Sequence, residues 1–535
     1  MSRRHLLVTS ALPYANGPIH LGHMVEFIQT DIWVRFQRLR GHTVLYMGAD
    51  DTHGTPIMLG AKREGLLPET LIAQVKERHE KDLHDFGIQM DLFYTTHSPE
   101  NEALLLEIYQ KCVDEHKIER RDIDQFYCES CDMFLPDRYL KGICPRCQSP
   151  DQYGDSCEVC SATYAPTDLL APRCATCHST PVLRTSEHYF FKLSECSSFL
   201  KAWIQSGHVR PEIQNKLMEW FTEGLQDWDI SRDAPYFGFQ IPDAANKYFY
   251  VWMDAPVGYM ATTLKWCRDH GQDFDSIWRK GPYEIHHFIG KDILYFHALF
   301  WPAMLVTAGF KTPEAIHVHG FLTVNGEKMS KSRGTFIMAR QYLDRLDPSY
   351  LRYYFAAKLN DAVEDLDFSW HDFVTRVNAD LINKFINIAS RIGAIVGKNW
   401  DGQLSDIDTA ADPILEEIAG AGDEIAAYMD SLSYNKAMMR VMQLADKVNK
   451  YIHDSEPWNL VTQDPDKAQA VCTSALTALW RLSVYMKPVV PDVVAKIECF
   501  LGKDIVSWEA HGQSMAGCKI RPFEKILDRL KPQTD

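Results

Sequence analysis

The segment His5-Leu6-Leu7-Val8-Thr9-Ser10-Ala11 runs into Leu12-Pro13-Tyr14-Ala15-Asn16-Gly17-Pro18 and then into Ile19-His20-Leu21-Gly22-His23. The first part is a short apolar run of strand type, and the second is rich in residues that break regular structure. The third part enters an amphipathic segment that extends to about residue 40. This order predicts a strand, a tight loop and the start of a helix, where unpaired N–H groups and the helix dipole favour an anion.

Two histidines stand at this predicted helix start. His20 and His23 are three residues apart, which places both imidazoles on one face of the first turn. Both can donate hydrogen bonds to phosphate oxygens, and Gly22 lets a ligand approach the backbone. Taken alone, the pair is a weak signal that is also compatible with a polar helix end or with a metal site. Far downstream, Lys328-Met329-Ser330-Lys331-Ser332 follows the strand-like run 315–324, and alone it would indicate a solvated turn.

Together the two segments resemble the paired nucleotide-binding motifs of class I aminoacyl-tRNA synthetases. Residues 20–23 match the His-Ile-Gly-His motif with Leu21 in place of Ile, and residues 328–332 match the Lys-Met-Ser-Lys-Ser motif without a change. The resemblance implies that His20 and His23 stabilise the α-phosphate of ATP during amino-acid activation. It also implies that Lys328 and Lys331 close over the leaving pyrophosphate, and that ATP arrives with Mg²⁺.

Size, charge and hydropathy narrow the class of protein. The 535 residues suffice for several domains. No apolar run is long enough to span a bilayer, and the first residues lack a signal peptide, so we expect a cytoplasmic protein without membrane contact. The net charge of −16 argues against a generic polyanion binder, although local basic patches could still hold a nucleic acid.

Periodicity and resemblance together predict the fold class. Residues 41–47 form a second strand-like run, whereas the apolar spacing of three or four over 374–395 begins an antiparallel helix bundle. We therefore expect an α/β fold, with a Rossmann-like parallel-sheet catalytic domain, a zinc-binding insertion and an α-helical anticodon-binding bundle. The expected boundaries are 1–117 and 233–325 for the two halves of the catalytic domain, 118–232 for the insertion, 326–372 for the stem-contact domain with the lysine loop, and 373–535 for the bundle.

Cysteine spacing predicts metal sites. Eight of the 14 cysteines form four Cys-x-x-Cys pairs, namely Cys128/Cys131, Cys144/Cys147, Cys157/Cys160 and Cys174/Cys177. A disulfide-rich secreted module is the competing interpretation, but no export signal is present. Four pairs predict two structural zinc sites of four thiolates each. Sequential pairing and nested pairing both remain open from spacing, and the resemblance to single-zinc bacterial methionyl enzymes favours nesting.

A pocket for the amino acid is implied by resemblance to the methionine-specific members of the family. Asp50 and Asp51 follow the second strand, where one could cap a helix, and the resemblance assigns Asp51 to the substrate ammonium. Arg232 would orient Asp51 through an ion pair. Strand alternation across residues 248–252 would turn Trp252 away from Val251. The residues that match the side-chain pocket are Leu12, Tyr14, Trp252, Ala255, Pro256, Tyr259, Ile293 and His297.

Two further groups of residues follow from the same resemblance. Gly290 would let adenosine approach the backbone and Asp292 would accept from ribose hydroxyls, although Asp292 could equally cap a helix. Asn387, Arg391 and Trp458 match the anticodon reader, with Trp458 expected in a loop after Pro457. Such polar pairs and loop tryptophans are also common on ordinary surfaces.

The resemblance covers nearly the whole chain and predicts a bacterial-type methionine-tRNA ligase with two zinc knuckles. The expected substrates are L-methionine, ATP and methionine tRNA, both initiator and elongator. A dimerisation module is not recognisable, so a monomer is expected. Two alternatives remain, a sister synthetase for leucine, isoleucine or valine, and a non-enzymatic zinc-containing RNA-binding paralogue. The short insertion and the intact motifs at His20, His23, Lys328 and Lys331 speak against them.

Overall fold

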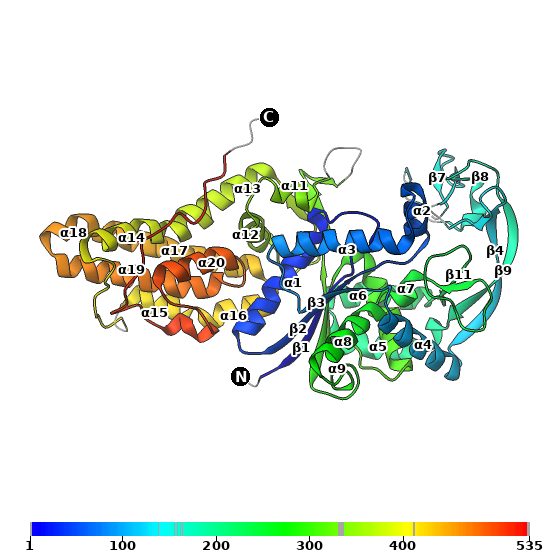
Figure 1. Cartoon of the computed structure of the whole chain (residues 1–535), viewed down its shortest axis with the longest axis horizontal. Helices are drawn as coiled ribbons and strands as arrows, with labels where there is room; N and C mark the ends of the chain where they lie inside the picture. The colour runs from blue at the N-terminus through cyan, green and yellow to red at the C-terminus, as the bar shows by residue number, and fades with distance from the viewer. Residues whose placement is uncertain are drawn as a thin grey trace.

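The computed structural model describes residues 3–136, 139–154, 156–157, 159–160, 162, 164–329, 336–409 and 412–531. The molecule is elongated, with a helical bundle at one end, a parallel sheet in the middle and a long two-stranded arm at the other end (Figure 1). Within the described residues, no helix is both long and apolar enough to cross a membrane.

The central sheet is parallel and has the strand order β14-β13-β1-β2-β3. Its strands are β1 (His5–Ser10), β2 (Thr43–Asp50), β3 (Leu92–Thr95), β13 (Tyr283–Gly290) and β14 (Ala315–His319). The order reverses between β1 and β13, and in open parallel sheets ligands bind beyond the carboxyl ends of the strands at such a switch point. The predicted first strand and its loop therefore lead directly to the expected binding edge.

Helices cover both faces of this sheet. Strand alternation sends Leu6 and Val8 of β1 into the core under α1 (Leu21–Leu39), and Leu7 into the core under α4 and α8. The other helices of this region are α2 (Thr55–Glu64), α3 (Pro68–Asp85), α4 (Pro99–Asp114), α7 (Val251–Asp254), α8 (Val257–His270), α9 (Asp275–Trp278) and α10 (Trp301–Thr307).

The first part of the insertion is a two-stranded antiparallel arm. Its long strands, β4 (Ile118–Cys128) and β9 (Val182–Phe191), pair along their length and carry the cysteine-rich tip. The short strands of the insertion and of its junction with the second half of the catalytic domain are β5 (Met133–Phe134), β6 (Leu140–Ile143), β7 (Gln152–Tyr153), β8 (Leu170–Cys174), β10 (Trp228–Asp229), β11 (Ser231–Asp233) and β12 (Lys247–Phe249). Helices α5 (Ser197–Trp203) and α6 (Pro211–Glu223) return the chain to the sheet.

The predicted strand 315–324 is two strands. The strand β14 ends before Gly320, and the next strand is β15 (Leu322–Val324). A Cβ added at Gly320 would lie 2.0 Å from the carbonyl oxygen of Glu364, so the backbone passes close to that residue. β15 pairs with β16 (Glu327–Lys328) and β17 (Leu366–Phe368) in a small separate sheet. Helices α11 (Ala339–Leu343) and α12 (Pro348–Lys358) complete this region.

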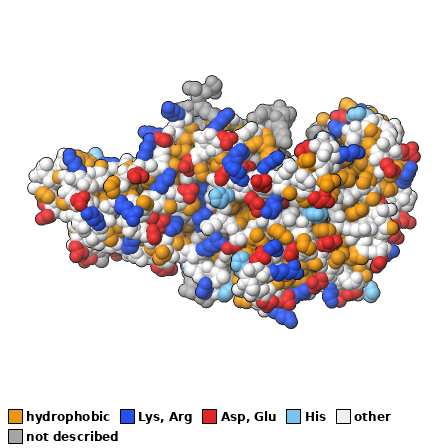
Figure 2. All heavy atoms as spheres, in the orientation of Figure 1, with side chains coloured by type: hydrophobic (Ala, Val, Ile, Leu, Met, Phe, Trp, Pro, Cys, Tyr) orange, Lys and Arg blue, Asp and Glu red, His pale blue; other side chains and the backbone are white. Residues whose placement is uncertain are grey.

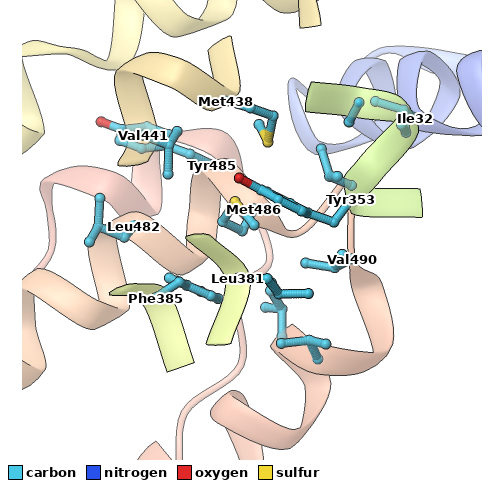
Figure 3. Close-up of a cluster of buried hydrophobic side chains, with 14 of the residues drawn as sticks. Ile32, Tyr353, Leu381, Phe385, Met438, Val441, Leu482, Tyr485, Met486 and Val490 are labelled. Carbon is cyan, nitrogen blue, oxygen red and sulfur yellow. The ribbon is translucent and has the colours of Figure 1, made fainter. Parts of the chain in front are cut away.

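The bundle shares its core with one face of the sheet domain. Figure 3 shows Ile32 of α1 and Tyr353 of α12 beside Leu381, Met438 and Tyr485 of the bundle, all buried in one cluster. Helices α15 and α16 are separated at Ala421. The bundle helices are α13 (Trp370–Arg376), α14 (Asn387–Trp400), α15 (Pro413–Gly420), α16 (Gly422–Asp430), α17 (Tyr434–Ser455), α18 (Pro457–Gln463), α19 (Pro465–Met486) and α20 (Pro491–Leu501).

Candidate active site

A cavity of about 530 Å³ opens at the switch point between β1 and β13. Segments far apart in the sequence meet there, namely the β1–α1 loop, the end of β13 and the passage from β14 to β15. Among the predicted site residues, those that line this cavity are Leu12, Tyr14, His20, Gly22, His23, Gly290, Asp292 and Ile293. The sheet thus brings together residues from two halves of the chain that the sequence separates by 250 positions or more.

Hydrogen bonds at the start of α1 fix the two imidazoles. His20 is the N-cap, and its Nδ1 accepts from the backbone N–H of Gly22 at 3.1 Å. The Nδ1 of His23 accepts from the backbone N–H of His20 at 3.3 Å. Burial lowers the pKa of His23 well below its ordinary value, with His20 and His79 adding to the shift. Because Nδ1 is the acceptor in each ring, a neutral ring carries its proton on Nε2, which remains the donor for an anion.

The segments around the two motifs are joined directly. The N–H of Leu21 donates to the carbonyl of Ile337 at 3.0 Å, and the N–H of Ala339 donates to that of Ile19 at 2.9 Å. A Cβ at Gly22 would lie 2.7 Å from Cε of Met329 and 2.9 Å from the ring of His20, so a side chain at this position would have to displace its neighbours. The predicted Lys331 lies outside the described residues, as does the side chain of Lys328, whose backbone belongs to β16.

A buried acid–base pair in the same cavity is absent from the sequence prediction. Glu26 lies on α1 one turn after His23, and its Oε2 is 3.1 Å from Nε2 of His319 at the end of β14. Burial raises the pKa of Glu26, and hydrogen bonding to Glu26 raises that of His319 against the effect of burial. The spacing of three residues from His23 to Glu26 could have indicated that both face the same side.

A second cavity of about 80 Å³ adjoins the first, and Leu12 and Ile293 line both. Its lining contains eight predicted residues together with Phe296, which the sequence analysis missed although it lies one turn after Ile293. The predicted residues are Leu12, Asp51, Trp252, Ala255, Pro256, Tyr259, Ile293 and His297. Mostly apolar and aromatic walls suit an unbranched thioether, because sulfur makes favourable contacts with aromatic rings. Tyr14 lines the larger cavity instead.

The structure defines the placement of Trp252 and the hydrogen bonds of His297 in this pocket. Trp252 lies on the short helix α7 and not on a strand, because β12 ends at Phe249, so the predicted strand alternation is wrong there. The Nδ1 of His297 is 3.1 Å from the carbonyl of Ile293, which can only accept. Its Nε2 therefore accepts from the hydroxyl of Tyr259 at 3.0 Å, and burial lowers the pKa of His297 to about 4.

Asp51 is half-buried at the edge of this pocket and still has an open acceptor. Its Oδ1 has no hydrogen-bond partner among the described residues. Burial raises the pKa of Asp51 well above its ordinary value, and the nearby Asp254 and Asp50 add to the shift. Nη1 of Arg232 lies 3.1 Å from Oδ2 of Asp229, and the role of Arg232 toward Asp51 stays a prediction. The carboxylate is thus placed to receive a cation from a ligand.

The eight cysteines of the arm form two groups of four thiols. One group is Cys128, Cys131, Cys174 and Cys177, and the other is Cys144, Cys147, Cys157 and Cys160, with all sulfur atoms of a group within 4.8 Å of one another. Sulfur–sulfur distances of 3.4 to 3.8 Å occur in both groups. A zinc tetrahedron with bonds of about 2.3 Å requires sulfurs about 3.8 Å apart, so both groups fit the ion. Nested pairing is confirmed.

The predicted anticodon residues lie together at the far end of the bundle. Trp458 occupies the first turn of α18 and not a loop, and it is 41% exposed. The guanidinium carbon of Arg391 on α14 lies 5.3 Å from the centre of its ring. The amide of Asn387, one turn earlier on α14, donates to Oδ1 of Asn449 at 3.4 Å. The arrangement offers an exposed aromatic face with a cation beside it.

Comparison with known proteins agrees with this geometry. Residues 6–393 match the family described as tRNA synthetases class I (M), and residues 404–519 match the anticodon binding domain of methionyl tRNA ligase. A Mycobacterium tuberculosis methionyl-tRNA synthetase in complex with methionyl-adenylate is 25% identical, with a TM-score of 0.81 over 98% of this chain and 99% of that chain. A second structure of that enzyme bound by methionyl-adenylate has 24% identity, a TM-score of 0.82 and coverage of 98% and 100%. Its free state has 23% identity, a TM-score of 0.75 and coverage of 99% for both chains.

Proposed function

The chain belongs to the class I methionyl-tRNA synthetases, and from this premise we propose which of its residues carry each step. It is a ligase that activates L-methionine with ATP and transfers the methionyl group to the 3′ end of methionine tRNA. One observation supports the residue assignment above all others, namely that the nucleotide-sized cavity and the small aromatic pocket share Leu12 and Ile293 as a common wall.

Activation needs no side-chain nucleophile. A carboxylate oxygen of methionine attacks the α-phosphorus of ATP, the bond to the bridging oxygen breaks, and pyrophosphate leaves. His20 and His23 donate Nε2–H groups to the α-phosphate oxygens, where charge builds up in the transition state. Lys328 and Lys331 neutralise the departing pyrophosphate, and Mg²⁺ enters as the phosphate complex of ATP. Gly22 and Gly290 allow close approach of the nucleotide, and Asp292 accepts from the ribose.

The amino acid is held at both of its ends. Asp51 pairs with the ammonium, and Arg232 orients Asp51. The side chain of methionine occupies the cavity between Trp252, Phe296 and Pro256, while Leu12, Tyr14, Ala255, Tyr259, Ile293 and His297 complete its surroundings. In the second step a 3′-terminal hydroxyl of the tRNA attacks the methionyl carbonyl, and AMP leaves.

Zinc and tRNA act outside the reacting centre. Each group of four cysteines holds one zinc ion, which closes the small loops at the tip of the arm and supplies no group to the reaction. We assign residues 1–117 and 233–325 to the catalytic domain, 118–232 to the insertion, 326–372 to stem contact and 373–535 to the anticodon, where Asn387, Arg391 and Trp458 read the bases. A cytoplasmic monomer completes the proposal, and size-exclusion chromatography with light scattering tests the oligomeric state.

The decisive experiment is ATP–pyrophosphate exchange with single amino acids. Methionine should support exchange, whereas leucine, isoleucine and valine should not, because the pocket is narrow and lined by aromatic rings. Exchange with a branched amino acid instead would favour the sister synthetases. Binding of tRNA without exchange by any amino acid would favour a non-enzymatic RNA-binding paralogue.

A further inference from the structure

A further histidine, His79, lies behind the nucleotide-binding loop and lines neither of the two cavities. His79 is on α3, is 1% exposed and uses both ring nitrogens. Its Nδ1 is 2.7 Å from Oδ1 of Asp50 at the end of β2, and its Nε2 is 2.8 Å from the carbonyl oxygen of Gly17 in the β1–α1 loop. A buried imidazole therefore links the end of one strand to the loop that follows another.

The contact with Gly17 fixes the direction of one hydrogen bond. A carbonyl oxygen can only accept, so Nε2 of His79 carries a proton and donates it. Nδ1 faces a buried carboxyl group and shares a proton with it. Wherever that second proton rests, the bond from Nε2–H to Gly17 stays intact, so Asp50 orients the ring and the ring holds the loop.

The loop needs such a contact at its middle. Its beginning is tied to the end of β2, because Ala15 donates to the carbonyl of Asp51 at 2.8 Å and Asp51 donates to that of Pro13 at 3.0 Å. Its end is tied to the segment after the lysine loop through the bond from Ala339 to Ile19 at 2.9 Å. Gly17 lies between these two anchors, three residues before His20.

Helix α3 also contacts the other nucleotide-binding segment. Asp82 and Asp85, one and two turns after His79, both pair with Arg340 of α11, at distances down to 2.5 and 2.7 Å. Arg340 lies close behind the lysine loop, three residues after Ile337, whose carbonyl accepts from Leu21. One helix therefore contacts both the loop of His20 and His23 and the exit of the lysine loop.

We propose that His79 is a positioning residue for the activation reaction, and that it acts through Gly17 to fix the loop that presents His20 and His23 to the phosphates of ATP. Asp50 is its orienting partner. The inference rests on the assignment of His20 and His23 proposed above. Its consequence is selective, because the methionine pocket contains neither His79 nor Gly17. Loss of the bond should impair ATP use and leave methionine affinity unchanged.

Two substitutions distinguish the contribution of Nδ1 of His79 from that of Nε2. The amide of glutamine reaches the position of Nε2, so His79→Gln keeps a donor for Gly17 and gives up the contact with Asp50. The amide of asparagine reaches only the position of Nδ1, so His79→Asn keeps the contact with Asp50 and loses Gly17. In methionine-dependent exchange, we expect His79→Asn to lower kcat/KM for ATP by about 10- to 100-fold, the effect of one hydrogen bond to a charged or polarised group.

The comparison includes its own controls. His79→Gln should stay within about threefold of the wild type, and Arg78→Ala, an exposed neighbour on the same helix, should match the wild type. Methionine affinity from calorimetry should be the same in all four proteins. Equal losses in the asparagine and glutamine variants, no loss in either, or a parallel loss of methionine affinity would overturn the inference.

Folding and the proposed function are checked separately. Each variant is melted first, and if His79→Asn is unfolded at the assay temperature, His79→Gln decides alone, since a tenfold loss in that folded variant contradicts the role of Gly17. A wild type without methionine-dependent exchange would overturn the proposed function and this inference with it. An active wild type with two equally active or equally impaired variants would overturn this inference only.

Discussion

At the residue scale, Asp51 links methionine binding to pH. Burial and the nearby Asp254 and Asp50 raise its pKa in the free enzyme, so a proton occupies the carboxyl well above the ordinary range. The substrate ammonium binds the ionised form and must displace that proton. Methionine affinity, measured by calorimetry across pH, should therefore weaken about tenfold per unit as the pH falls below the raised pKa, and should level off above it.

The variant Asp51→Asn tests that assignment. It removes the titrating group and the charge, so affinity should fall by about 10- to 100-fold and the pH slope should disappear. Asp229→Asn should keep the slope, because Asp229 pairs with Arg232 and not with the substrate. A slope that persists in Asp51→Asn would assign the titration to another group, such as the buried Glu26 and His319 pair.

Gly22 is a second residue-scale test. A Cβ there would lie 2.7 Å from Cε of Met329, which can move, and 2.9 Å from the ring of His20, so Gly22→Ala should displace that ring. We expect the exchange rate to fall by at least about tenfold, since misplaced catalytic groups are costly, with methionine affinity retained. Gly397→Ala is the matched control, because nothing lies within 4 Å of its added Cβ. Full activity of Gly22→Ala would show that the motifs separate during the reaction.

The parts of the site that could be predicted are those whose residues lie close together in one short sequence motif. His20, Gly22 and His23 could be placed at a helix start because strand, loop and helix follow one another in sequence. Glu26 and His319 could not be paired, since their contact depends on β14 lying two strands from β1. The link from His79 to Gly17 is equally invisible, because 62 residues separate them and only the packing of α3 joins them.

At the scale of elements, the arm offers a test of zinc pairing. Cys144→Ser/Cys157→Ser removes two ligands from one group of four and none from the other. Metal analysis of the purified protein should give about two zinc ions per wild-type chain and about one in this double variant. Cys128→Ser/Cys144→Ser is the matched control and should lose both ions. Sequential pairing would give the opposite results, with both ions lost in the first variant and one kept in the second.

At the same scale, two secondary-structure elements differ from the type that the sequence pattern predicted. The run 248–252 is aromatic and β-prone, yet the strand ends at Phe249 and Trp252 lies on a helix. Trp458 follows a proline, which we expected to keep it in a loop, but Pro457 occupies the first turn of α18, a position that suits its fixed φ angle. In both cases the predicted face or exposure is retained, and only the type of element differs from the prediction.

At the scale of the whole molecule, one helix joins the candidate active site to the helical bundle. Helix α1 carries His20 and His23 at its start, and farther along it packs against the bundle. Asp31 of α1 and Arg352 of α12 form a buried ion pair at 2.7 Å, and Arg352 also donates to the carbonyl of Val489 at 2.8 Å. A pair enclosed this way is costly to break, which keeps the bundle in a fixed position relative to the active site.

Charge alone does not explain how this molecule finds tRNA. The net charge is −16, and on the face shown in Figure 2 basic and acidic side chains are interspersed. We therefore propose that binding depends on a few specific contacts, such as the exposed ring of Trp458 beside Arg391. Stacking of one base on an aromatic side chain contributes about 1–3 kcal/mol.

The variant Trp458→Ala should therefore lower kcat/KM for aminoacylation of methionine tRNA by about one to two orders of magnitude. Exchange of ATP with pyrophosphate, which needs no tRNA, should be unchanged, because α18 lies at the end of the molecule away from the sheet (Figure 1). Trp458→Phe should keep most of the activity, since it retains a stacking surface. A parallel fall of exchange and aminoacylation in Trp458→Ala would show instead that the ring stabilises the bundle, and that the anticodon is read elsewhere.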